Sequence, residues 1–369
     1  MQVAEITTPA VLIDRGRVEN NTHEMARRAH RLGVRLRPHV KTHKCVEIAR
    51  MQVADHFGGI TVSTVAEAEH FAVAGFRDIT LGVPISLARI PQMLDISGRL
   101  DAFHLLVDSR RAIDALALAA RQGNQFVSVF LKVDCGYGRA GVVPGTEEAE
   151  ALAIALHEDA NIDFRGVLTH GGHSYDCLNR EEIRVIAEQE RVAVVDFAAL
   201  LRAKGIPVPE VSVGSTPTMC VAENLPGVTE IRPGNYAVFD RFQTAIGSCS
   251  PEDVAISVLA TVIGAYSDRL ILDCGALALS KDPGPTHVDP HCGFGQLMTE
   301  DMLPIEGLSL TGLSQEHGKV VGAAAKNFQV GDRLRVIPNH SCLTLACFDE
   351  VRVVDGSMVV DSWSPCRGW

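Results

Sequence analysis

The sequence predicts an α/β fold: a (β/α)8 barrel of the TIM type followed by a mostly β domain. Two observations lead to this prediction. From about residue 34 to 240, eight short β-rich runs alternate with stretches of helical period, and after about 245 strand-like runs continue with little helical period. Alternating strands and helices are typical of a parallel sheet, and eight such units can close on themselves. The barrel is expected over 15–245, and the β domain over 1–14 plus 246–369.

Each expected barrel strand is a short apolar run that turn residues bound. Between the strands, apolar residues recur three and four positions apart, as in 109–123 and 181–205, which predicts helices. The run PAVLID (9–14) precedes the barrel and is expected to pair with the β domain. The eight barrel strands are VRLRPHV (34–40), GGITVST (58–64), DITLGV (78–83), AFHLLVD (102–108), FVSVFLKVD (126–134), FRGVLTH (164–170), EVSVGS (210–215) and EIRPGNYAVF (230–239).

Composition excludes several classes of protein. The chain has 369 residues and a formal charge of −11, from 34 Lys+Arg against 45 Asp+Glu, which argues against a nucleic-acid partner. No run of about 18 uncharged apolar residues predicts a membrane span. The ten cysteines are scattered without a CxxC pair, and no signal-peptide start is visible. We therefore expect a cytoplasmic protein with reduced thiols that acts on a small molecule.

The run RPHVKTHK (37–44) concentrates two lysines, two histidines and one arginine at the end of the first barrel strand. A lysine there can form a Schiff base with a carbonyl cofactor once nearby cations lower its pKa. Lys41 is the candidate, and a solvated basic loop is the alternative. The positive field is expected from the neighbours Arg37, His39, His43 and Lys44.

Small and polar residues collect where the barrel strands end, which is where barrels place their active sites. Gly214-Ser215-Thr216 follows the seventh strand, and Gly234-Asn235 lies in the eighth. Such residues offer backbone N–H groups and hydroxyls to a phosphate, although Gly-Ser-Thr alone is often only a turn. His170 ends the sixth strand and Arg139 follows the fifth.

A candidate metal site lies in the β domain. His340 and Cys342 are two residues apart, and in a strand such residues share one face. Imidazole and thiolate suit Zn²⁺, and two protein ligands leave positions open for water or substrate. The alternative is a packed core cysteine beside an exposed histidine.

Taken together, the motifs resemble the D-serine dehydratase / D-threonine aldolase family of pyridoxal 5′-phosphate (PLP) enzymes. The resemblance covers nearly the whole chain, in order. It implies fold type III, similar to alanine racemase, with a barrel and a β domain, and a homodimer. The motifs are TPAVLIDRGRVENN, RPHVKTHK, ITVSTVAEAE, KVDCGYGRAGV, THGGHS, VSVGSTPT, IRPGNYAVFD, DCGALALSKD, LSQEHG, PNHSCLT and CRGW.

The resemblance also implies roles for individual residues. Lys41 would carry PLP, and Arg139 would lie near the ring edge of the cofactor. His340 and Cys342 match the metal ligands of the family, and His170 matches a histidine that faces the substrate in the aldolases. The residues implied to hold the phosphate, with a neighbour of the cofactor last, are Gly214, Ser215, Thr216, Gly234, Asn235 and Tyr236.

The metal pair separates the two activities of the family. Dehydratase-like members resemble H-x-C with Zn²⁺, whereas typical D-threonine aldolases carry H-x-D with a harder divalent ion such as Mn²⁺. The sequence has H-x-C, so we expect a lyase that converts D-serine or 3-hydroxy-D-aspartate into a keto acid and ammonia. Retro-aldol cleavage to glycine and an aldehyde is the alternative. Racemisation, for which only Tyr266 could supply a second base, and a non-catalytic PLP carrier are disfavoured.

Overall fold

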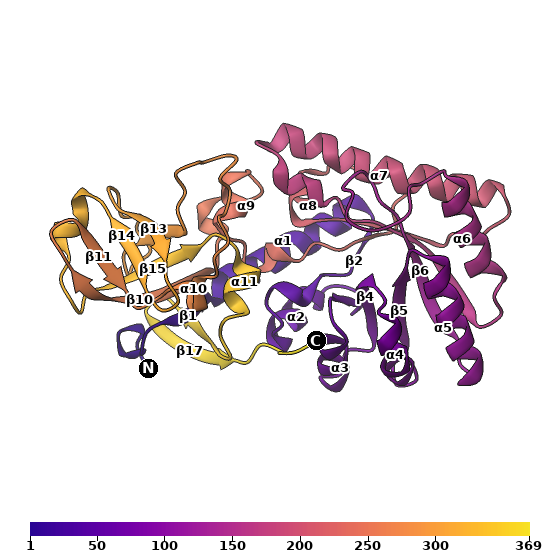
Figure 1. Ribbon diagram of the computed structural model, residues 1–369, viewed down its shortest axis with the longest axis horizontal. Coiled ribbons are helices and arrows are strands. Elements are labelled where there is room, and N and C mark those ends of the chain that lie inside the picture. Colours follow the sequence, from indigo (N-terminus) through magenta and orange to yellow (C-terminus); the bar gives the residue numbers. More distant parts are fainter. The chain divides into compact units, whose positions relative to one another are not determined.

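The computed structural model describes residues 1–369, which form two compact units (Figure 1). The barrel unit comprises Met25–Lys41, Ala49–Gly234 and Cys366–Trp369. The β unit comprises Met1–Glu24, Thr42–Ile48 and Asn235–Pro365. The domain limits that the sequence suggests, 15–245 against 1–14 plus 246–369, stay a prediction.

The barrel unit contains a single sheet of eight parallel strands. Its strands are β2 (Arg35–Leu36), β3 (Ile60–Val62), β4 (Asp78–Pro84), β5 (Ala102–Val107), β6 (Val127–Lys132), β7 (Ile162–Leu168), β8 (Glu210–Val213) and β9 (Glu230–Ile231). Their order is β2-β9-β8-β7-β6-β5-β4-β3. A parallel bridge between His39 and Thr61 joins the two edges of this sheet, where Thr61 N donates to Pro38 O at 2.8 Å. The ring closes, and the predicted barrel is confirmed.

Strands β2 and β9 are much shorter than the runs 34–40 and 230–239 that the sequence predicts. Each run contains a proline, Pro38 or Pro233, which has no N–H to donate to a neighbouring strand. Beyond β2 the first segment donates only two more backbone bonds to the second, from Arg37 N to Ile231 O and from His39 N to Pro233 O, both at 2.9 Å. The residues that follow are therefore in loops at the C-terminal rim of the barrel.

Helices α3 to α7 lie around these strands (Figure 1). Helix α5 starts where the Ser109 side chain accepts from Ala112 N, and α7 where Asn179 accepts from Glu182 N, as helix caps do. The predicted helices at 109–123 and 181–205 are confirmed. The helices are α1 (Arg15–Leu32), α2 (Val46–Val53), α3 (Val65–Val73), α4 (Ile90–Ser97), α5 (Arg110–Gln122), α6 (Glu147–Glu158), α7 (Arg180–Ala203), α8 (Thr216–Val221), α9 (Arg241–Ala245), α10 (Ala276–Leu279) and α11 (Ser341–Leu345).

The β unit is built on a second sheet, of nine strands. These are β1 (Ala10–Asp14), β10 (Ile256–Ala265), β11 (Arg269–Leu272), β12 (Gly295–Met298), β13 (Ser309–Leu313), β14 (Gly318–Val321), β15 (Arg333–Pro338), β16 (Val351–Asp355) and β17 (Met358–Trp363). Strand β1 pairs antiparallel with β10 and parallel with β16, which confirms the prediction for PAVLID.

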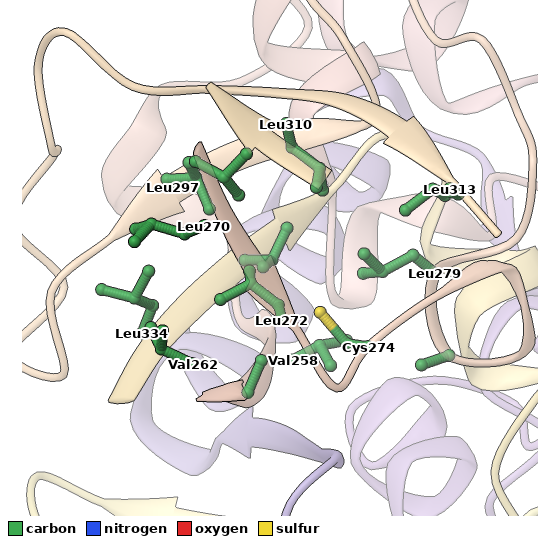
Figure 2. Close-up of a cluster of buried hydrophobic side chains, with 14 of the residues drawn as sticks. Val258, Val262, Leu270, Leu272, Cys274, Leu279, Leu297, Leu310, Leu313 and Leu334 are labelled. Carbon is green, nitrogen blue, oxygen red and sulfur yellow. The ribbon is translucent and has the colours of Figure 1, made fainter. Parts of the chain in front are cut away.

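One face of this sheet forms an apolar core (Figure 2). Alternate residues of β10, among them Val258 and Val262, are fully buried there with Leu270 and Leu272 of β11, as the two-residue period of a strand requires. None of the ten cysteines of the chain forms a disulfide. None of its helices combines the length and the apolar character needed to cross a membrane.

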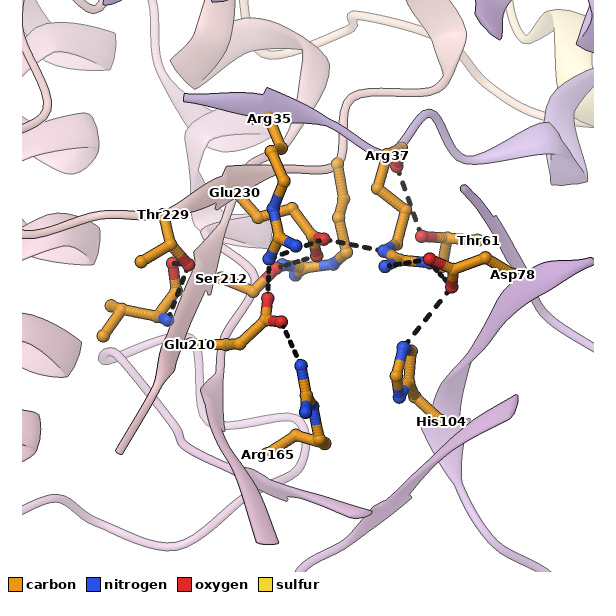
Figure 3. A network of polar contacts seen from close by, with 12 residues as sticks. Arg35, Arg37, Thr61, Asp78, His104, Arg165, Glu210, Ser212, Thr229 and Glu230 are labelled. Atoms are coloured by element: carbon orange, nitrogen blue, oxygen red, sulfur yellow. Dashed lines mark hydrogen bonds and ion pairs between the residues drawn. The ribbon is translucent and has the colours of Figure 1, made fainter. Parts of the chain in front are cut away.

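In the barrel unit, a network of ion pairs lies at the N-terminal end of the strands, the end opposite the C-terminal rim (Figure 3). Arg37 is almost fully buried there; its Nε donates to Glu230 Oε2 at 2.7 Å, and its guanidinium also bonds to Asp78. Burial lowers the pKa of Arg37, but Glu230 and Asp78 outweigh burial and raise it. The expectation that Arg37 contributes to the field around Lys41 is wrong, because carboxylates at the far end of the barrel take up its charge.

Beside this network lies a polar cavity of about 310 Å³, lined by residues that include Arg35, Arg165 and Glu210. Both arginines bond to Glu210. Because barrel enzymes place their sites at the other end of the strands, we assign this cavity and its ion pairs to stability.

Replacing Glu230 with Gln is expected to lower the free energy of unfolding by about 3 kcal/mol, because it removes one partner of a buried ion pair. Urea unfolding measures this. The matched control is Asp101→Asn in the exposed pair with Arg77, which should leave the midpoint unchanged.

The same pair sets a pH dependence. Burial raises the pKa of Glu230, but Arg37 outweighs burial and holds it below its usual range. The contribution of the Glu230–Arg37 pair to the free energy of unfolding is therefore complete above about pH 4.3, and it is lost as the pH falls and Glu230 is protonated. A Glu230→Gln variant as stable as the wild type at neutral pH would contradict the assignment.

Candidate active site

The loops after β2, β8 and β9 meet at the C-terminal rim of the barrel. Gly234 N donates to Thr216 Oγ1 at 3.3 Å. A Cβ added to Gly234 would lie 2.6 Å from the backbone oxygen of His39, so only glycine allows this approach. Lys41 N in turn donates to His39 Nδ1 at 3.4 Å. Three of the segments that the sequence singled out are thus brought together.

His39 does not supply the positive charge that the sequence suggested. Burial, followed by the charges of Lys41 and Arg232, holds its pKa well below 6.5, so the ring is neutral. His43 is fully buried in the β unit, where its Nδ1 accepts from Cys45 N at 3.1 Å. The basic run therefore does not act as one cluster, because its side chains go to different surroundings.

The positive charge near Lys41 comes instead from other strands. Lys132 ends β6 and Arg232 follows β9, and both are buried. Burial, with the charges of Arg232 and Arg139, lowers the pKa of Lys132 to about 7. Burial also lowers the pKa of Arg232 to about 10, against the opposing effect of Glu230. Sequence reasoning missed both, although a lysine within the apolar run FVSVFLKVD was a visible signal.

His170 follows β7 and turns its ring toward the loop after β8. Its Nδ1–H donates to Gly214 O at 3.1 Å. Burial, then Lys41 and Lys132, holds the pKa of His170 well below 6.5, so the ring is neutral and its Nε2 is left as an acceptor. Tyr137 meets His170 edge to face, with 6.4 Å between ring centroids, and the Arg139 guanidinium lies 5.1 Å from the centroid of the Tyr137 ring.

The segment from Gly214 to Thr218, between the end of β8 and the first turn of α8, is called the cradle. Ser215 and Thr216 are buried, and Ser215 Oγ lies 3.0 Å from Ser174 Oγ. Gly214 has a φ of 121°, which favours glycine, and its N–H donates to Glu190 Oε1 at 2.9 Å. Gly214 therefore shapes the loop, while its own N–H is already bonded.

The predicted metal pair lies in the β unit, but not on a strand. His340 is the N-cap of α11 and Cys342 lies in its first turn, so the shared face of a strand does not apply. Both residues nevertheless lie at the start of the same short helix. Burial lowers the pKa of His340, but the bonds to Asp282 and Cys342 outweigh burial and raise it to about 11.

Other side chains of the β unit hold this pair in place. His340 Nδ1 donates to Asp282 Oδ2 at 2.9 Å, an arrangement that leaves Nε2 available to a metal. Cys342 Sγ donates to Thr42 Oγ1 at 3.2 Å, and Thr42 is the residue after Lys41. No group of three or more His, Cys, Asp or Glu side chains has the geometry to hold a metal ion, there or elsewhere in the chain.

Asp240, which sequence reasoning also missed, anchors the loop between His340 and Cys342. Its Oδ2 accepts from Ser341 N at 2.9 Å and from Asn235 Nδ2 at 2.8 Å. Asn235 also donates to Ser341 Oγ at 2.8 Å, and Tyr236 is fully buried. The structure therefore places Asn235 and Tyr236 in the β unit, with the Asn235 side chain engaged near the metal pair.

Comparison with known proteins assigns the family. Residues 13–241 match the family described as "Alanine racemase, N-terminal domain", and residues 255–354 match "Putative serine dehydratase domain". The chain is 42% identical to D-threo-3-hydroxyaspartate dehydratase of Delftia sp. (strain HT23), over 99% of this chain and 98% of that protein. It is 34% identical to D-serine dehydratase of Dictyostelium discoideum, over 100% and 98%. The chain belongs to the D-serine dehydratase / D-threonine aldolase family.

A solved structure agrees with this assignment. A variant of D-threo-3-hydroxyaspartate dehydratase in the metal-free form matches with a TM-score of 0.95 and 40% identity, over 100% of both chains. The family and the fold that the motifs predicted are confirmed. The prediction of a lyase is confirmed as well, because the relatives are dehydratases.

The family implies PLP, and the barrel rim fits it. PLP carries an anionic phosphate, and the rim brings Lys41, Lys132 and Arg232 into one electrostatic cluster. Lys132 is 6% exposed and its side-chain amine makes no hydrogen bond or ion pair, so an anionic guest would stabilise a buried amine. Gly214 and Ser215 after β8 and Gly234 after β9 are small residues that keep the backbone accessible to a phosphate.

Replacing Lys132 with Met is expected to raise the free energy of unfolding of the cofactor-free protein at neutral pH, because it removes a buried amine that has no partner. The wild type should become more stable as the pH rises from about 7 to about 10, where only the unfolded state holds the lysine proton. Urea unfolding at several pH values measures both effects. If the free energy of unfolding changed with pH equally in the wild type and the variant, the assignment of this pH dependence to Lys132 would be wrong.

Proposed function

We propose that the protein is a PLP- and zinc-dependent dehydratase of D-3-hydroxy amino acids. Its substrate is D-serine, giving pyruvate and ammonia, or 3-hydroxy-D-aspartate, giving oxaloacetate and ammonia. The observation that carries the proposal is the placement of an imidazole and a thiol at the start of α11, where Asp282 orients His340 and Cys342 lies in the first turn. They form a soft ligand pair on a hydroxy amino acid lyase scaffold. The names of the two relatives support the substrate class. The proposal includes a homodimer located in the cytoplasm, as expected from the sequence.

Lys41 is proposed to hold PLP through its amine. Bound PLP supplies an electron sink for the bond that breaks at Cα. The Lys41 amine would also serve as the general base that removes the Cα proton of the substrate. Lys132 and Arg232, buried in the same cluster, provide positive charge for the anionic groups of the cofactor.

The cradle residues are proposed to bind the phosphate. Ser215 and Thr216 contribute hydroxyls, and Gly234 lets the backbone approach closely. Arg139 is proposed to lie near the ring edge of the cofactor. The residues proposed to hold the phosphate also include Gly214 and Asn235. Tyr236 is proposed as a neighbour of the cofactor.

Zinc is proposed to bind to His340 Nε2 and Cys342 Sγ. The donors fit, because imidazole and thiolate are zinc ligands and Asp282 fixes the orientation of the imidazole. Binding would displace the protons of His340 Nε2 and Cys342. The ion would supply Lewis-acid assistance to departure of the β-hydroxyl group. That a relative has been solved in a "metal-free form" is consistent with a metal in that protein.

One observation favours a second candidate, retro-aldol cleavage to glycine and an aldehyde. His170 is neutral with Nε2 as an acceptor, so it could remove the proton of the β-hydroxyl group. In a dehydratase the same atom would accept a hydrogen bond from that hydroxyl. The products therefore distinguish the two reactions.

Protein loaded with PLP and zinc is expected to release keto acid and ammonia from D-serine or 3-hydroxy-D-aspartate, and a chelator or Cys342→Ala should lower the rate at least about a hundredfold. Quantifying keto acid against glycine and aldehyde measures this. The control is Cys347→Ala, an exposed cysteine near the end of α11. Glycine with aldehyde would replace the dehydratase proposal by the aldolase one, and no product at all would reject the substrate class.

Asp282→Asn is expected to weaken zinc binding about 10- to 100-fold, because the His340 imidazole loses the carboxylate that orients it. Competition with a chromophoric chelator measures the affinity without any assay of activity. Asp289→Asn is the matched control, because Asp289 pairs with Arg241 and not with the metal pair. Wild-type zinc affinity in the Asp282 variant would contradict the assignment.

A further inference from the structure

Glu190 is a buried carboxylate to which the reaction gives no role. It lies in the middle of α7, on the helix face that also buries Ala187, Val194 and Phe197, and none of its surface is exposed. No lysine or arginine forms an ion pair with it. Burying an unpaired carboxylate costs free energy unless hydrogen bonds compensate. Glu190 accepts three, from Gly171 N at 2.6 Å, Gly214 N at 2.9 Å and Thr218 Oγ1 at 3.0 Å.

Two of these donors lie in loops that carry the proposed site, and the third, Thr218, lies in α8 directly after one of them. Gly171 follows His170 in the loop after β7, and Gly214 opens the cradle after β8. The Gly214 residue is held on both sides, because its N–H donates to Glu190 and its C=O accepts from His170 Nδ1. The second bond also fixes which nitrogen of His170 carries the proton. Glu190 thus holds the group that orients His170.

The third donor extends the same support along the cradle. Thr218 Oγ1 donates to Glu190 Oε2 and accepts from Ser215 N at 3.0 Å. Ser215 Oγ also lies 3.0 Å from Thr218 Oγ1. One carboxylate therefore restrains both ends of the Gly214-to-Thr218 segment.

We propose that Glu190 is a positioning residue. It fixes the cradle that binds the cofactor's phosphate and the imidazole of His170 in their positions relative to each other. It acts through Gly214 and Thr218 and touches neither cofactor nor substrate. The inference rests on the proposed function, because the cradle is assigned there to PLP. It goes further in naming the residue that preorganises the two loops, which lowers the cost of ordering them on binding.

The test measures PLP affinity by titrating the apoprotein and following the absorbance of the bound cofactor. Glu190→Ala should weaken binding at least about tenfold, the effect of losing one charge-assisted hydrogen bond. Glu190→Gln should lose less, because its carbonyl oxygen still accepts from Gly171 and Gly214 while its NH2 group donates to Thr218. Glu188→Gln is the matched control, since Glu188 lies on the same helix, exposed and paired with Arg191.

Thermal unfolding of each apoprotein separates positioning from general stability. A purely structural role would lower the midpoint without changing the affinity of the folded protein for PLP. If Glu190→Ala does not fold, Thr218→Val decides, since it removes one of the three donors and should weaken PLP binding about threefold or more.

Each outcome bears on the inference. Failure of the wild type to bind PLP would overturn the proposed function, and the inference with it. Wild-type PLP binding together with unchanged affinity in Glu190→Ala, or in Thr218→Val where the first variant does not fold, would overturn the role of Glu190 alone.

Discussion

The barrel depends on how it compensates arginines and a lysine buried inside its ring of strands. At the N-terminal end, Arg37 is paired directly with Glu230, and the carboxylate of Glu230 also stabilises the charge of Arg232. At the C-terminal end no such direct pair reaches Lys132. A direct ion pair therefore compensates the buried arginine at the N-terminal end, whereas Lys132 has none at the end where a ligand is proposed to bind.

Most of the fold could be predicted from the sequence, because it follows from periodicity. Eight apolar runs with helical stretches between them predict the barrel, and PAVLID is correctly placed in the second sheet. The errors concern directions that periodicity does not fix. The runs around Pro38 and Pro233 end as strands after two residues, and Arg37 turns toward carboxylates at the far end of the barrel.

The candidate site could be predicted only in part, for a related reason. Motifs name residues that are close in sequence, whereas the site is assembled across strands. Lys132, Arg232 and Glu190 become relevant only once the ring closes and their surroundings are known. In the same way, H-x-C predicts two soft ligands, but the short helix that brings them together and the Asp240 that anchors its start depend on residues 100 positions away.

The cationic side chains at the rim have a consequence for how ligands arrive. The chain as a whole is acidic, with a formal charge of −11, yet Lys41, Lys132 and Arg232 make one end of the barrel locally positive. A narrow positive region on a negative protein draws small anions toward itself and keeps large polyanions away. Capture of a dicarboxylic amino acid, which is a net anion, would therefore be faster than capture of a neutral zwitterion of the same size, and the difference would shrink as ionic strength rises.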